Sequence, residues 1–438
     1  MAGGTFTEQN KIRPGAYINF VNEAGAANQV SVRGIMTMSL SLPWGESKTI
    51  LSVDGATNFR EVLGYDLTAP QLLLVREGLK RAKTLLLYRL NEGVKATATH
   101  ENLVATAQFG GVRGNDLSIK VQQNVDDVGK FDVQTLLSGT VVDVQTVAAI
   151  SELKANSWVT FIGSGDLSAT AGIPLSGGSD GTVTNQDHSD YLQAVELHDF
   201  NTIALFSNAA DLKALYTAFV KRQREDEGRK VQGVLENYPT ADSEGILSVK
   251  NGVVLEDGTV LSAMQTVAWL AGATAAAEAN ESLTYQAYDG AVDVSPRYTN
   301  TQIEVALKNG EILFTQSKGR AIVEQDINTL TGFTPEKGKQ FSKNRVIRVL
   351  DGVANDLKNV FETYYIGKVS NNADGRNLFR KECIKYMEQL QNSNAIQNFD
   401  GQKDVTVSAG SASDGVYIEV NVQPVDAVEK IYMKVQVQ

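Results

Sequence analysis

The sequence predicts an α/β (α+β) multidomain protein: a mixed-sheet core, interrupted by an inserted β-sandwich domain and flanked by extended N- and C-terminal strand arms. Helical and buried-strand patterns alternate in two separate stretches, which is typical of a parallel or mixed sheet. Between them lies a stretch rich in Thr, Val, Ser, Gly and Asp with short alternating runs, which favours a sandwich. At 438 residues the chain is too long for one ordinary core, so several domains are expected.

We divide the chain into six consecutive parts on these changes of pattern. The expected parts are an N-terminal arm (1–35), a first core segment (36–95), the inserted β-sandwich (96–181), a second core segment (182–344), a C-terminal domain (345–424) and a C-terminal arm strand (425–438).

The first core segment is expected to contain a helix followed by a buried strand. Residues 71–83 place Leu72, Val75 and Leu79 on one helical face. Residues 83–90 then form a nearly continuous apolar run, as a central strand requires. In the insert, the alternating runs are short, and a turn-rich segment at 175–181 marks its end.

Alternating helix and strand patterns resume in the second core segment. We expect helices at 191–197 and 210–221, strands at 202–206 and 231–235, an Ala-rich helix from Leu261, and short strands near Ile303 and Ile312. In the C-terminal domain, apolar residues are spaced for helices at 345–367 and 376–391, followed by a strand that begins at Val416.

Both ends of the chain are expected to be strands that pair with neighbouring subunits. Ile431, Tyr432, Met433, Val435 and Val437 belong to a run with period-two alternation that reaches the last residue. A strand at a terminus needs a partner for its backbone groups, and addition to another subunit's sheet supplies one. Alternation alone is equally consistent with pairing inside the same subunit.

The N-terminal arm carries a similar short apolar run. Its candidate inter-subunit residues are Tyr17, Ile18, Phe20 and Val21.

Composition excludes several classes of protein. The formal net charge of −11 argues against nonspecific binding to nucleic acid, whose phosphates require a basic face. The single cysteine, Cys383, excludes a disulfide framework within the chain. No charged-then-apolar leader and no apolar run of about 18 residues is evident. We therefore expect a protein that is made and kept in the cytoplasm, without direct membrane contact.

The sequence offers no convincing catalytic, cofactor or metal site. Its histidines are His100, His188 and His198, and the acidic residues near the last two fit none of the zinc spacings. Two fragments, 45–49 and 332–340, partly match a phosphate-binding loop, but each departs from the required glycine, lysine and hydroxyl spacing. A large protein whose ends are expected to be strands, and which offers no convincing catalytic, cofactor or metal site, has the profile of an assembly subunit.

Several segments in order resemble contractile tail sheath proteins, particularly those of PBSX-like defective prophages and of phages of Gram-positive bacteria. The similar segments are 14–17, 83–89, 111–117, 175–181, 271–276 with 281–285, and 430–435. Arg113 departs from the aromatic residue that many relatives carry there.

The resemblance implies a virion tail, or a phage-tail-like particle, assembled in the host cytoplasm. The subunits would form stacked hexameric rings around an inner tail tube protein, with baseplate and tail terminator proteins as further partners and no direct contact with nucleic acid. The arms would link neighbouring subunits, and contraction would drive the tube through the target envelope. The resemblance leaves open whether the particle is an infectious phage or a headless, phage-tail-like bacteriocin.

A helix at 377–394 is the candidate contact with the inner tube. A contact that must hold and then release favours polar groups. The candidate residues are Arg376, Arg380, Lys381, Lys385 and Glu388. The alternative is an ordinary solvated helix face. The inserted sandwich would then lie on the outside of the tube.

Two other functions compete with this one. A capsid or surface-layer subunit would share the arms but form shells or flat lattices. An enzyme with an unrecognised carboxylate site would form a small oligomer that is indifferent to removal of either arm.

Overall fold

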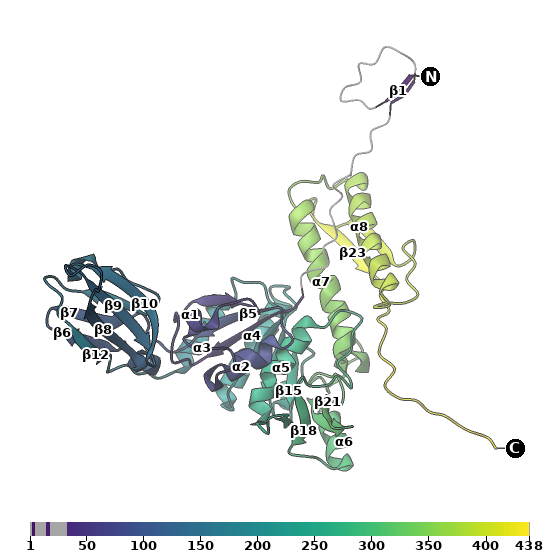
Figure 1. Ribbon diagram of the computed structural model, residues 1–438. Helices are drawn as coiled ribbons and strands as arrows, with labels where there is room; N and C mark the ends of the chain where they lie inside the picture. The colour runs from purple at the N-terminus through teal and green to yellow at the C-terminus, as the bar shows by residue number, and fades with distance from the viewer. Residues whose placement is uncertain (1, 5–14, 18–32, 438) are drawn as a thin grey trace.

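The computed structural model describes residues 2–4, 15–17 and 33–437 (Figure 1). Within them, a β-sandwich projects from one side of an α/β core, and a unit containing two long helices lies on the other side (Figure 1). This arrangement confirms the predicted fold class.

A seven-stranded mixed sheet forms the centre of the core, in the order β19-β15-β14-β13-β3-β5-β4. Every neighbouring pair is parallel except β4 with β5, which is antiparallel. The strands are β3 (Ile35–Leu40), β4 (Ile50–Val53), β5 (Thr84–Arg89), β13 (Thr202–Ala204), β14 (Gln232–Glu236), β15 (Ile246–Val249) and β19 (Glu311–Ile312).

Helices cover both faces of this sheet. On β5, Leu85 and Leu87 belong to the apolar cluster shared with α5, whereas Leu86 and Tyr88 belong to the cluster shared with α3 and α4. A strand that is buried on both faces explains the continuous apolar run in the sequence. The core helices are α1 (Phe59–Leu63), α2 (Leu73–Leu79), α3 (Asn185–Val195), α4 (Ala210–Glu225) and α5 (Ala263–Ala276).

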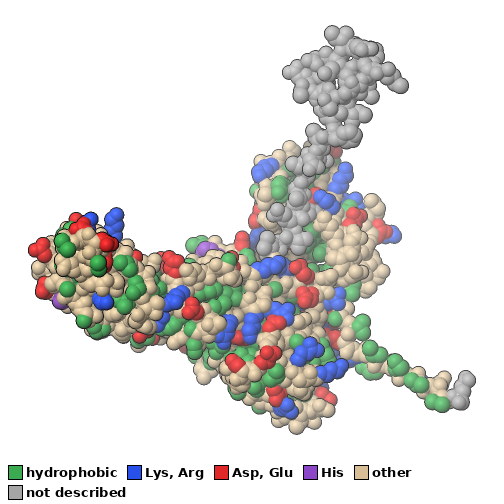
Figure 2. Space-filling view, viewed as in Figure 1, with side chains coloured by type: hydrophobic (Ala, Val, Ile, Leu, Met, Phe, Trp, Pro, Cys, Tyr) green, Lys and Arg blue, Asp and Glu red, His purple; other side chains and the backbone are tan. Residues whose placement is uncertain are grey.

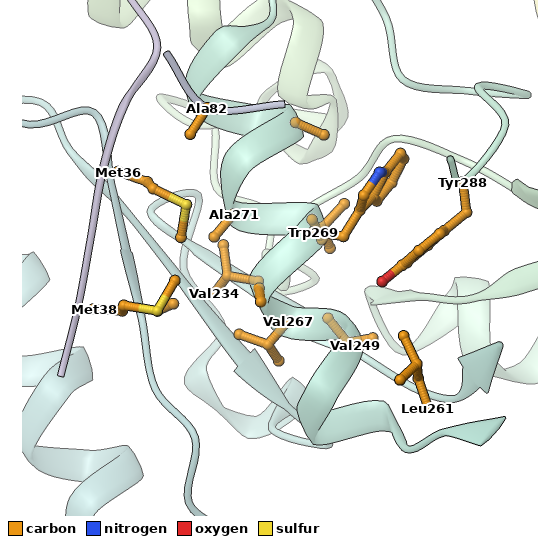
Figure 3. Packing of buried hydrophobic residues seen from close by; sticks show 14 of the residues in the cluster. Met36, Met38, Ala82, Val234, Val249, Leu261, Val267, Trp269, Ala271 and Tyr288 are labelled. Carbon is orange, nitrogen blue, oxygen red and sulfur yellow. The ribbon is translucent and has the colours of Figure 1, made fainter. Parts of the chain in front are cut away.

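Helix α5 is buried almost all round, which accounts for its alanine-rich sequence. Val267, Trp269 and Ala271 pack among residues of the sheet and of the following segment (Figure 3). A Cβ atom on Gly272 would lie 2.4 Å from the carbonyl oxygen of Gly78 on α2. Only glycine therefore permits the two helices to approach this closely.

The insert is a sandwich of two antiparallel sheets, with strand orders β10-β9-β8-β12 and β11-β7-β6. Trp44, from the core side, stacks on Trp158 of the insert with ring centroids 5.4 Å apart, so an aromatic contact joins the two parts. The strands are β6 (Thr97–His100), β7 (Leu103–Ala107), β8 (Leu117–Gln123), β9 (Phe131–Leu137), β10 (Thr140–Val147), β11 (Val159–Ile162) and β12 (Thr170–Pro174).

The strand predicted near Ile303 is wrong, because Ile303 lies in helix α6 (Asn300–Lys308). Thr299 and Gln302 form a capping box, in which the Thr299 amide donates to Gln302 Oε1 over 2.9 Å.

The remaining strands of this region are β16 (Gly252–Leu255), β17 (Val260–Leu261), β18 (Ala291–Ser295), β20 (Phe314–Ser317) and β21 (Arg320–Val323). A capping box also starts α3 at Asn185, earlier than expected.

The C-terminal unit contains both predicted long helices and a hairpin of two strands. Its elements are α7 (Asn344–Tyr364), α8 (Ala373–Asn392), β22 (Val405–Ala409) and β23 (Val416–Val420). Strand β22 was not predicted from the sequence.

The two ends of the chain differ from each other in the described structure. At the N-terminus, β2 (Gly15–Tyr17) pairs in parallel with β1 (Ala2–Gly4) of the same chain. At the C-terminus, residues 426–437 have no strand partner in the single described chain, so their pairing with a neighbouring subunit stays a prediction. Ile18, Phe20 and Val21 lie outside the described residues.

Candidate assembly interface

The C-terminal arm leaves the folded unit at a short backbone contact. The amide of Gln397 donates to the Gln423 carbonyl over 3.0 Å, and the amide of Val425 donates to the Ala395 carbonyl over 2.9 Å. Pro424 forms an isolated antiparallel bridge with Ile396. These bonds fix the chain as far as residue 425.

Glu429 makes a second attachment, on the surface of the core region. Its carboxylate forms an ion pair with Lys343 and accepts hydrogen bonds from Gln325 Nε2 over 2.6 Å and from Thr284 Oγ1 over 3.0 Å. Burial favours a higher pKa, but the bonds from Lys343, Gln325 and Thr284 outweigh it and hold the pKa of Glu429 below its usual value. The carboxylate is therefore held in its charged form at the root of the arm.

Beyond Glu429 the arm carries large apolar side chains into solvent. Ile431 is 80% exposed, Val435 74% and Val437 93%. The segment runs away from the body as an extended chain, and hydrophobic side chains follow it (Figures 1 and 2). A row of exposed apolar residues with no sheet partner in the described chain marks an interaction site.

The β22–β23 hairpin offers a sheet that is covered on one face only. On the covered face, Val405 and Ile418 pack in an apolar cluster with Phe379 and Cys383 of α8. On the other face, Tyr417 and Glu419 of β23 point outward and are exposed. In the described part of the chain, each of the two strands pairs only with the other. A two-stranded sheet is marginal by itself and gains stability from added strands.

Helix α8 separates the candidate tube-contact residues into two groups. Arg376 donates to the side chain of Asn371 over 2.8 Å, and Arg380 donates to the carbonyls of Val405 and Gly401 over 2.8 and 2.7 Å. Both arginines thus hold the C-terminal unit together. The other three candidates, Lys381, Lys385 and Glu388, are exposed.

The residues that the sequence offered for a metal site or a phosphate-binding loop form hydrogen bonds or ion pairs with other protein groups. His188 is buried and contacts the Tyr216 hydroxyl over 2.9 Å, and burial lowers its pKa. Lys48, in the first phosphate-loop-like fragment, forms an ion pair with Asp187. In the second fragment, the Gly332 amide donates to the Asp242 carboxylate over 2.8 Å, so that amide already has an anionic partner.

Two further features concern cofactors and membranes. Across residues 2–4, 15–17 and 33–437, no group of at least three His, Cys, Asp or Glu residues is placed to hold a metal ion. In the same part of the chain, no helix combines the length and apolar character needed to span a bilayer.

Burial raises the pKa of the Cys383 thiol to about 12, so the thiol is unreactive at neutral pH.

Sequence reasoning missed Glu429 and strand β22, although it predicted the strand that begins at Val416. The alternation of Val405 and Val407 with Thr406 and Ser408 was a strand signal for β22. No sequence signal pointed to the partners of Glu429, because they lie 86 to 145 residues away along the chain.

Family models cover most of the chain. They are the Gp18 domain III N-terminal region of tail sheath proteins (33–90), the phage tail sheath β-sandwich domain (91–180), the central domain (181–329) and the C-terminal domain (336–438).

Relatives and solved structures of similar length agree. Phage-like element PBSX protein XkdK of Bacillus subtilis (strain 168) is 42% identical over the full length of both chains. The crystal structure of a sheath tail protein from Desulfitobacterium hafniense is 58% identical, with a TM-score of 0.89 over 97% of this chain and 100% of that one. The contracted helical sheath of the anti-feeding prophage shares the fold at 12% identity, with a TM-score of 0.59 over 98% of this chain and 100% of that one.

Proposed function

Because the chain belongs to the phage tail sheath family, we propose that it polymerises as stacked hexameric rings around an inner tail tube and contracts to drive that tube through a target envelope. The observation that carries the proposal is the exposed apolar arm after Glu429, which has strand coding but no strand partner in its own described chain. The role is structural, without a catalytic step or cofactor.

The C-terminal arm of one copy is proposed to add a strand to the β22–β23 hairpin of another. The arm supplies alternating apolar residues, and the hairpin supplies an apolar layer over α8 and open backbone edges. Each main-chain hydrogen bond contributes roughly 0.5–1.5 kcal/mol, and buried apolar surface adds about 25 cal/mol per Å². An arm that contributes several such bonds would remain attached while the subunit bodies rotate.

The N-terminal arm is proposed to make a second link, through Tyr17, Ile18, Phe20 and Val21. The exposed residues Lys381, Lys385 and Glu388 of α8 are retained as the candidate contact with the inner tube, since polar contacts hold register and release readily. Baseplate and tail terminator proteins would cap the ends of the tube. The particle would assemble in the host cytoplasm.

A pair of neighbouring substitutions tests the arm. Val435→Asp puts a charge on the apolar side of the alternating pattern, and Gln436→Asp puts the same charge on the opposite side. Negative-stain electron microscopy of the purified full-length chain should show hollow cylinders for the wild type and for Gln436→Asp but not for Val435→Asp. Discrete small particles from all three proteins would overturn the sheath proposal, and cylinders from all three would overturn the role of the arm.

Cross-linking tests the receiving sheet. Lys434 lies on the arm and Lys403 precedes β22, and both are exposed. In cylinders grown from a mixture of ¹⁵N-labelled and unlabelled chains, an amine-reactive cross-linker should join Lys434 of one copy to Lys403 of another. Cylinders in which Lys434 is linked only to lysines remote from the hairpin would assign the arm to a different sheet.

A further inference from the structure

A small polar cavity of about 20 Å³ lies where Arg33, which precedes β3, meets the central sheet, α5 and α7. Its volume exceeds the roughly 10–15 Å³ that one water-sized occupant needs. All of its lining residues are polar or charged. They are Arg33, Asn201, Thr202, Lys230, Gln232, Thr274, Arg348, Asp351 and Asn355.

The lining carries hydrogen-bond donors that no described protein group satisfies. Arg348 is 1% exposed; its Nη1 donates to Asp326 over 2.8 Å and to the Glu281 carbonyl over 2.9 Å. Its Nε and Nη2 have no partner within the described residues, and neither does Nε of Arg33. A buried charged donor without an acceptor costs more than a neutral one, so these nitrogens require an acceptor.

The carboxylate that lines the cavity does not supply this acceptor. Both oxygens of Asp351 accept from Arg224, over 2.7 and 2.9 Å. Lys230, on the same lining, adds another positive charge. Burial and the nearby Arg348 guanidinium lower the pKa of Arg33, although Asp351, Glu278 and Asp356 act in the opposite direction.

The donors distinguish between the two kinds of occupant that could fit. A water molecule accepts hydrogen bonds but brings two donors of its own, whereas the unpartnered guanidinium nitrogens require acceptors alone. An anion brings acceptors alone and adds a negative charge beside the guanidinium groups of Arg33 and Arg348, of which only Arg348 has an ion pair, with Asp326, among the described residues. We propose that this cavity binds a small monovalent anion, of which chloride is the probe, in contact with Arg33 and Arg348.

Such an anion would tie three segments that are distant in the sequence. Arg33 lies two residues before the start of β3, where the N-terminal arm joins the core; Thr274 lies on α5 and Arg348 on α7. The occupied site would therefore stabilise the root of the N-terminal arm against the core and the C-terminal unit. This inference concerns the single folded chain and does not depend on the proposed function.

The thermal midpoint of the purified full-length chain tests the site. Sodium chloride should raise the midpoint by about 2 °C or more relative to sodium gluconate at equal ionic strength, and the rise should saturate, because ligand binding to the folded state stabilises it. Arg33→Gln should remove most of this difference. Arg320→Gln, which removes the same charge at an exposed position, should keep it. Equal midpoints in the two salts for the wild type would overturn the proposal, as would an undiminished chloride effect in Arg33→Gln.

Bromide provides a direct test that requires no variant. Anomalous diffraction from wild-type crystals grown in sodium bromide should show a peak within contact distance of Arg33 and Arg348. A refined water at that position, with bromide found only on the surface, would overturn the anion assignment.

Discussion

Strand β5 and the C-terminal arm both have sequence patterns typical of strands, a continuous apolar run in β5 and an apolar–polar alternation in the arm, but their surroundings are opposite. Leu85 and Leu87 of β5 face one helical layer, Leu86 and Tyr88 face the other, and strands pair on both edges. Residues 431–437 expose both faces and have no strand partner in the described chain. The comparison shows that a sequence pattern typical of a strand requires a pairing partner and a surface to bury it. The pattern does not specify whether the same chain or another chain supplies that partner.

The largest difference is expected in the stability of the single chain. Leu85→Ala should lower the free energy of unfolding by about 2–5 kcal/mol, because the site is fully buried. Val435→Ala, at an exposed site, should change it by less than about 0.5 kcal/mol. Urea denaturation of unassembled protein measures both values. A large effect of Val435→Ala would mean that the arm is packed on its own subunit.

A smaller loss is expected where α8 holds the hairpin. Arg380→Ala removes the donors to the carbonyls of Val405 and Gly401 and should destabilise the C-terminal unit by about 1–3 kcal/mol. Lys381→Ala, on the exposed side of the same helix, is the matched control and should have little effect. Hydrogen exchange of the β22 amides reports the difference, and equal protection in both variants would contradict the assigned role of Arg380.

The root of the arm should respond to acid. The pKa of Glu429 is lower in the folded state than in the unfolded chain, so its contribution is complete above about pH 4.3 and is lost as the pH falls through the folded-state value. Proteolysis with an acid-active protease should therefore cut residues 426–430 faster at low pH. Glu429→Gln, which cannot form the ion pair with Lys343, should be cut at a rate that depends less on pH.

Glu419→Gln is the control for this experiment, because it makes the same substitution at an exposed glutamate on β23. Its cleavage should keep the wild-type dependence on pH. If Glu429→Gln retains the full dependence as well, the acid sensitivity must arise from another group.

The smallest effect on the single chain is expected at the candidate tube face. Lys385→Glu reverses an exposed charge and should leave the free energy of unfolding within about 0.5 kcal/mol of the wild type. If α8 contacts the inner tube, the same variant should weaken co-assembly with tube protein, measured by co-sedimentation. Unchanged co-sedimentation would favour the solvated-face interpretation.

Local patterns were sufficient for the regular elements of the core. The one-sided spacing around Val75, the apolar run of β5 and the Ala-rich α5 were each predicted because periodicity and composition are read within a few residues. Ile303 was misassigned because the capping signal from Thr299 to Gln302 was overlooked. Strand β22 was missed although its alternation is visible in the sequence.

By itself, the sequence determined that this protein has an α/β core, a β-rich insert and a strand-coded C-terminus, because each depends on local periodicity. Only the tertiary structure decided which residues surround Glu429, namely Thr284, Gln325 and Lys343. It also decided that Arg380 holds the hairpin instead of remaining free on the surface. Finally, it placed Arg33 and Arg348 on the lining of one cavity. These contacts join residues far apart in the chain, and their geometry depends on how whole elements pack.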